Sequence, residues 1–178
     1  SYVIENLFGE VQTVSCLGKT HVPRRIDEDG EEYEATADDA AYAILELEDD
    51  VVAQLNSSWT VRVKRDDLLT IQVDGTEGSA VAGLRDCETQ HHSNTPKPEW
   101  NPDTPTEHDF HEDWEPVPNN MEFENAFKAQ WQEFIRHVVA DETFPWDFRE
   151  GAKGVQLTEA AHLAWEDGRR VALDELDG

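Results

Sequence analysis

The stretch NSSWTVRVKRDD holds the residue types in this sequence that are best suited to binding a ligand. Trp59 offers a flat apolar face against which a ring-shaped molecule can pack. Arg62 and Arg65 carry guanidinium groups whose forked donors suit hydroxyl or carboxylate groups. We predict that these three side chains contact a ligand. The alternative is a local salt-bridge network in which the basic side chains pair with Asp66 and Asp67.

His21, in the stretch GKTHVPRR, is a further candidate for ligand contact, together with Arg24. It follows an alternating apolar segment, so it is expected at the end of a strand. An ordinary surface histidine is the alternative interpretation. Nucleophilic hydrolysis is disfavoured, because Ser57 and Ser58 lack the strand-turn-helix elbow that such a serine needs. Pairs of carboxylates give no evidence for glycoside hydrolysis, since 40 acidic residues guarantee coincidental pairs.

Two groups contain side-chain types that bind metals: His108-Asp109 with His111-Glu112, and Cys87 with His91 and His92. Neither has the spacing of a closed zinc site. The first group also lies in a proline-rich segment. We therefore expect no metal site in this chain.

The charge of the chain is strongly negative, with 40 acidic residues against 14 basic ones and a net charge of −26. Such a surface repels nucleic acid and anionic lipid, so neither a nucleic acid nor a membrane is expected as a partner. The acidic residues are dispersed, and lysine is scarce. This pattern is typical of a protein that works at high salt, where screening removes self-repulsion. An ordinary acidic cytoplasmic protein is the alternative.

The length of 178 residues is that of one domain with a sizeable core. The sequence has no apolar run long enough for a membrane helix and no visible signal peptide at its start. Its two cysteines, Cys16 and Cys87, are expected to be free thiols in a reducing compartment, although one disulfide is the alternative. We therefore expect a cytoplasmic protein.

The order of elements favours an α+β fold with one large, mostly antiparallel open sheet and helices packed on one face. Alternating apolar residues, with turns at Asp29-Gly30 and Glu48–Asp50, predict strands first. The expected strands cover residues 10–22, 40–47, 51–63, 69–73, 79–84 and 87–92. Residues 93–120 form a long irregular loop, which in a compact domain is usually functional or disordered.

Two helices are expected late in the chain, over residues 122–142 and 148–168, followed by a short strand at 169–173. The first has an apolar stripe that includes Phe127, which is expected to pack in the core. At the other end, residues 2–8 have helical spacing and Gly9 follows as a C-cap would, yet only Ser1 precedes them and no helix start is visible. A frayed terminal helix, a tag remnant and a chain cut from something longer all explain this.

Three stretches resemble the C-terminal domain of the Gfo/Idh/MocA (glucose–fructose oxidoreductase/inositol dehydrogenase) superfamily. They are the hairpin IQVDGTEGSAVAG, the preceding hairpin ADDAAYAILELEDDVVAQLNSSW, and the segment from FIRHVVADE to RRVAL. The resemblance implies a dihydrodipicolinate-reductase-like fold over residues 1–178, with residues 1–9 as the tail of the helix that links two domains. This accounts for a chain that begins at the end of a helix.

The resemblance also implies a function: the substrate-binding and oligomerisation half of an NAD(P)-dependent oxidoreductase that acts on a sugar, polyol or related compound. In this family the nicotinamide cofactor and the catalytic residues belong to an N-terminal Rossmann domain. The catalytic residues are therefore expected upstream of Ser1, and this chain alone is expected to bind no cofactor and to be inactive. A homodimer through the open sheet face and a substrate contact at Asn125 are implied in the same way. The alternative is a stand-alone, non-catalytic module that binds a carbohydrate or a protein.

Overall fold

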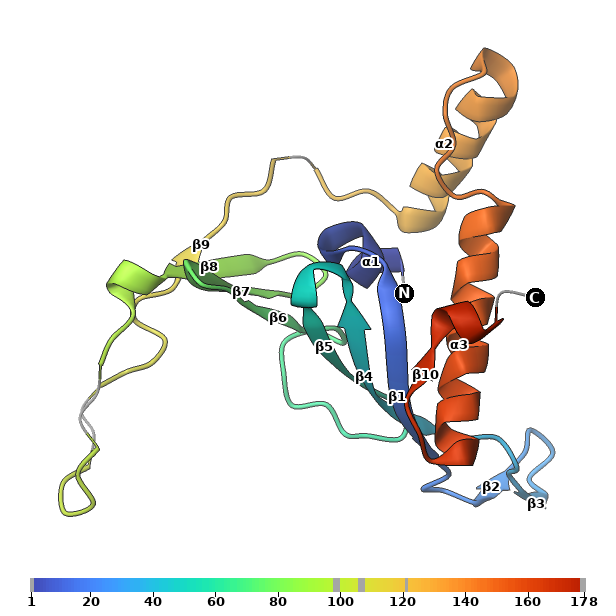
Figure 1. Ribbon diagram of the computed structural model, residues 1–178, viewed down its shortest axis with the longest axis horizontal. Coiled ribbons are helices and arrows are strands. Elements are labelled where there is room, and N and C mark those ends of the chain that lie inside the picture. Colours follow the sequence, from blue (N-terminus) through green and yellow to red (C-terminus); the bar gives the residue numbers. More distant parts are fainter. Residues whose placement is uncertain (1, 98–99, 106–107, 121, 177–178) are drawn as a thin grey trace. The chain divides into compact units, whose positions relative to one another are not determined.

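The computed structural model describes residues 2–97, 100–105, 108–120 and 122–176 (Figure 1). The chain divides into two compact units. One comprises residues 1–62 and 136–178, and the other comprises residues 63–135. Each unit contains its own four-stranded antiparallel sheet.

Two sequence predictions fall partly outside the described residues. Ser1, upstream of which the catalytic residues are expected, is not among them, and the described part of the terminal helix begins at Tyr2. The location of the catalytic residues upstream of Ser1 therefore stays a prediction. Residues 98–99 and 106–107 of the expected loop at 93–120 are also outside the described ranges.

The first unit is built on a sheet with the strand order β10-β1-β4-β5. Its strands are β1 (Val11–Lys19), β4 (Ala40–Leu47), β5 (Val52–Ser58) and β10 (Val171–Ala172). In β4, alternate residues face opposite sides of the sheet. Leu45 and Leu47 are buried, whereas Tyr42 and Ile44 are exposed. The sheet therefore has one covered face and one open face.

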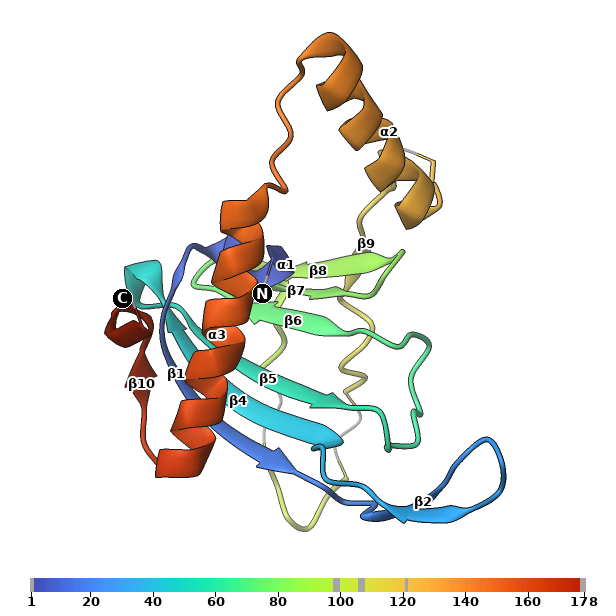
Figure 2. The same cartoon turned by 90° about the vertical axis from the view of Figure 1, so that its right-hand side faces the viewer.

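The covered face lies against helix α3 (Phe148–Asp167), which runs across the strands of this unit (Figure 2). Asp147 caps its start by accepting hydrogen bonds from the amides of Arg149 and Glu150, and Gly168 ends it in a left-handed conformation with φ of 64°. Small residues on the helix let it approach the sheet closely. The buried core comprises Val11, Val14, Ala43, Leu45, Leu47, Ala160, Ala164 and Val171.

Short elements complete this unit. Helix α1 (Tyr2–Phe8) precedes β1, and the 3-10 turn η1 (Glu48–Asp50) joins β4 to β5. Strands β2 (Arg24–Ile26) and β3 (Glu32–Glu34) form a hairpin around the expected turn, and η3 (Leu173–Leu176) follows β10. These elements confirm the predicted turns at Asp29-Gly30 and Glu48–Asp50.

The second unit holds a sheet with the order β6-β7-β8-β9. Its strands are β6 (Ile71–Asp74), β7 (Gly78–Ala82), β8 (Cys87–His91) and β9 (Glu115–Pro116), and the 3-10 turn η2 (His92–Asn94) follows β8. Gly78 permits close pairing of β7 with β8, because a Cβ there would lie 2.5 Å from the carbonyl oxygen of Gln90.

Helix α2 (Ala126–Ala140) begins after Asn125, whose Oδ1 accepts hydrogen bonds from the amides of Phe127 (3.0 Å) and Lys128 (3.2 Å). None of the residues of α2 is buried. The side chain of Phe127 is 77% exposed and that of Trp131 is 62% exposed. The core position predicted for Phe127 is therefore wrong in this chain: the apolar stripe exists, but the described residues do not cover it.

The α+β fold class is confirmed, with antiparallel sheets and a helix packed on a sheet face. Within the described ranges, the strands are divided among three hydrogen-bonded sheets instead of forming one continuous ladder. The strand predicted to end at Val63 ends at Ser58. There the Ser58 hydroxyl accepts a hydrogen bond from the amide of Thr60 (3.2 Å), a local turn that competes with the ladder.

Candidate functional site

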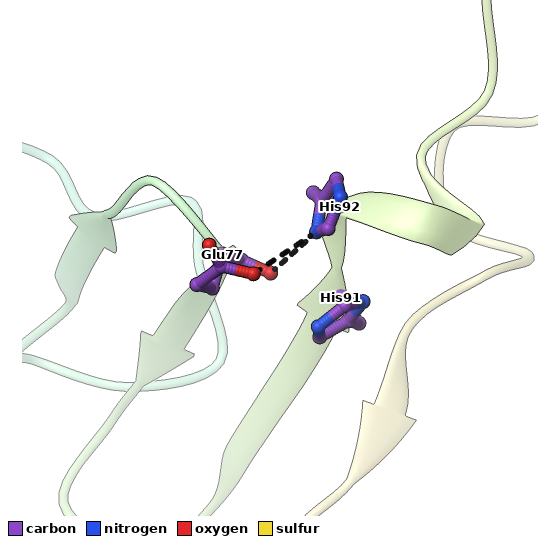
Figure 3. A group of neighbouring side chains, drawn as sticks. All are labelled: Glu77, His91 and His92. Carbon is purple, nitrogen blue, oxygen red and sulfur yellow. Dashed lines mark hydrogen bonds and ion pairs between the residues drawn. The ribbon is translucent and has the colours of Figure 1, made fainter.

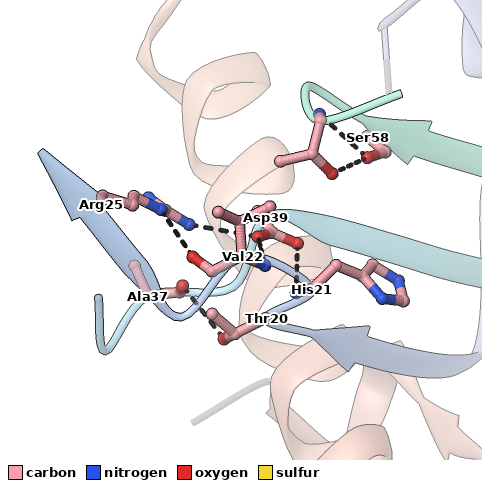
Figure 4. Close-up of polar contacts among 8 residues, drawn as sticks. Thr20, His21, Val22, Arg25, Ala37, Asp39 and Ser58 are labelled. Atoms are coloured by element: carbon pink, nitrogen blue, oxygen red, sulfur yellow. Dashed lines mark hydrogen bonds and ion pairs between the residues drawn. The ribbon is translucent and has the colours of Figure 1, made fainter. Parts of the chain in front are cut away.

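A buried carboxylate organises the end of the first sheet, where β1 ends and β4 begins (Figure 4). The side chain of Asp39 is fully buried. Its two oxygens accept hydrogen bonds from the amides of His21 and Val22, each at 2.8 Å, and from Nη2 of Arg25 at 3.2 Å. Its own backbone is also tied: the amide donates to the carbonyl of Lys19. Asp39 therefore holds the loop after β1 in one conformation.

The charge of Asp39 is stabilised within the protein. Burial acts to raise the pKa of this carboxyl group, because a charged group loses hydration in the interior. The two amide hydrogen bonds and the positive charge of Arg25 outweigh burial and hold the pKa below its ordinary value. Asp39 is thus an ionised anchor with its oxygens already occupied, which makes it a positioning group and a poor general base.

Arg25 extends from the same network to the surface. Its Nε donates to the carbonyl of Val22 (3.0 Å), and its guanidinium carbon lies 4.6 Å from the ring centre of Trp59. This is the geometry of a cation–π contact. The sequence analysis placed Arg24 beside His21. In β2, however, Arg25 is the half-buried residue and Arg24 is exposed, so Arg25 is the one that turns inward.

His21 and Tyr42 form a second contact at this end of the sheet. His21 Nε2 lies 3.1 Å from the hydroxyl of Tyr42, and the two rings meet edge to face. Tyr42 projects from the open face of the sheet, where Leu17 of β1 is its direct neighbour. Both polar groups are accessible, which gives the site a hydroxyl and an imidazole that can exchange their mutual hydrogen bond for one to a ligand.

Three of the five predicted ligand contacts belong to the first unit and two to the second. His21 and Trp59 meet at the Asp39 network, and the Trp59 side chain is 66% exposed, although Arg25 occupies part of its ring. Arg62 is exposed in the same unit. Arg65 and Asn125 belong to the second unit.

The alternative of a salt-bridge network around the basic stretch is not what the structure shows. In the described part of the chain, Arg62 and Arg65 have no carboxylate partner within 4.0 Å. Nη2 of Arg65 donates instead to the carbonyl of Leu68 (2.6 Å). Asp67 accepts from the amides of Leu68 and Leu84, and these hydrogen bonds contribute to lowering its pKa.

Arg25, Asp39 and Tyr42 are the residues that the sequence analysis missed. Asp39 left one signal, because it stands directly before an alternating apolar strand, in the hairpin stretch that resembled the family. Tyr42 lies within the strand predicted over residues 40–47, but it was not named as a ligand contact. Together with His21 and Trp59 they form what we call the Asp39 site. It offers an aromatic surface and hydrogen-bond donors and acceptors, together with the Arg25–Asp39 ion pair, which is a set suited to binding.

The state of the two cysteines agrees with the sequence prediction: Cys16 and Cys87 are free thiols. Burial is the main cause that raises the pKa of the Cys16 thiol. In the part of the chain that the structure describes, no helix is both long and apolar enough to span a membrane.

Comparison with known proteins gives consistent matches. A family model described as "Oxidoreductase family, C-terminal alpha/beta domain" matches residues 2–173. A D-xylose dehydrogenase from Paenarthrobacter nicotinovorans is 49% identical over 180 residues, which cover 99% of this chain and 46% of that protein. The chain thus spans about half the length of the curated relative that it matches.

Solved structures agree on the fold. A levoglucosan dehydrogenase in complex with NADH and L-sorbose superposes with a TM-score of 0.71 at 16% identity, covering 96% of this chain and 47% of that one. An NAD binding oxidoreductase from Klebsiella pneumoniae gives a TM-score of 0.71 at 14% identity, covering 96% and 47%. The resemblance found in the sequence is confirmed, and this chain belongs to the C-terminal alpha/beta domain family of the Gfo/Idh/MocA oxidoreductases.

Proposed function

We propose that this chain is the substrate-binding half of an NAD(P)-dependent sugar dehydrogenase that acts on an aldose such as D-xylose. The observation that carries the proposal is the 49% identity to a D-xylose dehydrogenase over 99% of the chain. The proposal gives the Asp39 site the role of contacting the sugar. A stand-alone carbohydrate-binding module of the same fold is the second candidate, and the experiment below separates the two.

The chemistry of the Asp39 site supports a sugar ligand. A pyranose ring presents C–H groups on its faces and hydroxyls at its edge, which match an exposed indole beside polar groups. In this proposal Trp59 packs against the ring, and His21 and Tyr42 bind hydroxyls. Arg25 keeps the indole in place through the contact of 4.6 Å.

Arg62, Arg65 and Asn125 stay proposals as substrate contacts. Arg62 and Arg65 retain N–H donors for hydroxyl groups. Asn125 uses its Oδ1 to cap α2, so its amide nitrogen is the atom that could reach a ligand.

The proposal assigns the cofactor and the catalytic residues to a domain that precedes Ser1. The sequence contains no G-x-G-x-x-G loop after a strand, which is the usual phosphate-binding signature of dinucleotide domains. NAD(P) would accept the hydride there, while this chain holds and orients the sugar. We further propose a cytoplasmic enzyme, because both cysteines are free.

We also propose a homodimer that pairs through the open face of the first sheet. This face carries a patch of exposed apolar side chains on three adjacent strands: Leu17 on β1, Ile44 on β4 and Val52 on β5. Glu46 lies on the same face. Hydrogen bonds from Thr13 and Arg170 satisfy its carboxylate and lower its pKa. Because Glu46 is already paired with Arg170, the apolar patch can pack against a second copy of the same surface without burying an unpaired charge.

Nicotinamide fluorescence tests the proposal directly. NADH and NADPH are titrated into this chain and into a form extended upstream by the preceding domain of its parent gene. We expect binding by the extended form alone. In a separate assay that supplies the oxidised cofactor, NAD+ or NADP+, the extended form should reduce it to NADH or NADPH as it oxidises D-xylose. If the upstream gene segment encodes no dinucleotide domain, or if the extended form binds cofactor but oxidises no sugar, the dehydrogenase proposal is wrong.

Two tryptophan variants of the extended form test the Asp39 site. Trp59→Ala should raise the KM for the sugar about 2- to 12-fold, because an aromatic contact contributes about 0.5–1.5 kcal/mol. Trp100→Ala is the matched control, since its side chain is 87% exposed in a loop outside this site. Equal KM values for the two variants would remove Trp59 from the sugar-binding surface.

A further inference from the structure

Three potential metal ligands meet at one end of the second sheet (Figure 3). Glu77 precedes β7, His91 ends β8, and His92 begins η2. One ligand atom from each lies within 4.8 Å of those from the other two. Among the described residues, this is the one group of three or more such side chains that close together.

The backbone brings these residues together. Gly78 pairs with His91 in the ladder, and the amide of His92 donates to the carbonyl of Glu77 (2.9 Å). Successive side chains on a strand point to opposite faces. Because the chain leaves β8 for η2 at His92, the two imidazoles come together instead, with ring centres 4.6 Å apart. The local fold therefore presents both rings on the side of Glu77.

In the sequence, His91 and His92 stand near Cys87, and the spacing of these three residues predicts no metal site. Cys87 and His91 stand at opposite ends of β8, so the thiol is not a member of the group. Glu77 takes its place, since the hairpin brings the end of the 75–78 turn beside the end of β8. The sequence spacing alone does not reveal this third ligand.

We propose that Glu77, His91 and His92 bind a divalent transition-metal ion, with Zn²⁺ as the ion of best fit. Two imidazoles and one carboxylate form a ligand set that zinc accepts, with water at a fourth position. Nδ1 of His92 lies 3.5 Å from Oε2 of Glu77. Two ligands at about 2.0–2.2 Å from a tetrahedral zinc ion are separated by about 3.3–3.6 Å, so this pair already has the required spacing.

The ring of His91 is held by Ser93. Its Nδ1 accepts a hydrogen bond from the amide of Ser93 (3.2 Å) and lies 2.8 Å from the hydroxyl oxygen of the same residue. When Nε2 binds a metal, the proton moves to Nδ1, which then donates to the Ser93 hydroxyl instead of accepting from the amide, and such a hydrogen bond fixes the orientation of a ligand ring. All three ligands are exposed, so side-chain rotation closes the remaining distance. The bound ion would link the turn before β7 to the end of β8.

Isothermal titration of the untagged chain with ZnCl₂ tests this proposal. An excess of about 100-fold MgCl₂ occupies the carboxylate-only sites of this acidic surface, since magnesium prefers oxygen ligands. We expect one zinc ion per chain. His91→Gln, His92→Gln and Glu77→Gln should each weaken binding about tenfold or more, because even a partner of a ligand contributes about 10- to 100-fold.

His111→Gln is the matched control, because His111 is an exposed histidine outside the group. A second readout is the unfolding temperature, which zinc should raise in the parent and the control but not in the three ligand variants. Zinc affinity unchanged in His92→Gln, or lowered equally in His111→Gln, would overturn the site. Loss of all zinc binding in excess magnesium would also overturn it.

Discussion

Replacing Gly18 with alanine tests the close packing between β1 and α3. An ideal Cβ at position 18 would lie 2.5 Å from both Cε3 and Cζ3 of Trp165. Ordinary carbon contacts are about 3.5–4.0 Å, so the indole or the strand has to move by about 1 Å. Overpacking of this kind costs about 1–3 kcal/mol. For a chain of this size, that corresponds to a fall of roughly 3–9 °C in Tm.

Gly151→Ala is the matched control. Gly151 lies in α3, and no atom is within 4 Å of the position that a Cβ would take. Alanine there should stabilise the protein by about 0.5–1 kcal/mol, because glycine weakens a helix interior. The two glycine-to-alanine changes are therefore predicted to have opposite signs.

Urea unfolding at fixed KCl concentration, followed by circular dichroism, measures both variants. A third variant, Trp165→Leu, removes the ring that a Cβ at position 18 would meet. In that background, Gly18→Ala should lose most of its cost, which a double-mutant cycle detects as coupling. Equal stabilities for Gly18→Ala and Gly151→Ala would refute the packing argument. So would an undiminished cost of Gly18→Ala in the Trp165→Leu background.

Two further predictions concern the charge and the open face. The lowered pKa of Asp39 means that its carboxylate adds stability above its unfolded pKa of about 3.9, and this stability is lost as the pH falls through the folded pKa. Asp39→Asn should therefore lower the urea midpoint near neutral pH and flatten the decline of this midpoint below about pH 5. Asp38→Asn should follow the parent's curve of urea midpoint against pH. Identical curves for the parent and both variants would contradict this prediction. Ile44→Lys should dissociate the proposed dimer in sedimentation velocity, because it places a charge in the apolar patch. Val155→Lys, which changes an exposed residue of α3, should not, and a dimer that survives Ile44→Lys does not use this face.

Much of the first sheet follows from residue periodicity. The alternation in β4 predicts which residues face α3 and which stay exposed, and the acidic turn at Glu48–Asp50 predicts the return strand. Gly168 ends α3 as expected, because a left-handed residue there favours glycine. These features depend on neighbours within a few positions, which a sequence shows directly.

The Asp39 site depends on contacts that a sequence does not show. Arg25 reaches Asp39 across a separation of 14 residues, and this contact depends on the path of the intervening hairpin. Glu77 meets His91 for a similar reason, since the β7–β8 register decides which side chains face each other. The apolar stripe of α2 illustrates the converse case. Its periodicity correctly predicts a helix, but periodicity does not say which surface will cover it.

In the Asp39 site, the residue that fixes the shape of the loop is not one of the residues whose rings are exposed. The loop after β1 takes its shape from backbone amides held by Asp39, not from the exposed rings that the loop and strands display. Position 39 therefore tolerates little variation, whereas the side chains of His21, Tyr42 and Trp59 can change without loss of the support beneath them. Under the proposed function, a combinatorial library at these three positions would vary sugar preference on an unaltered framework.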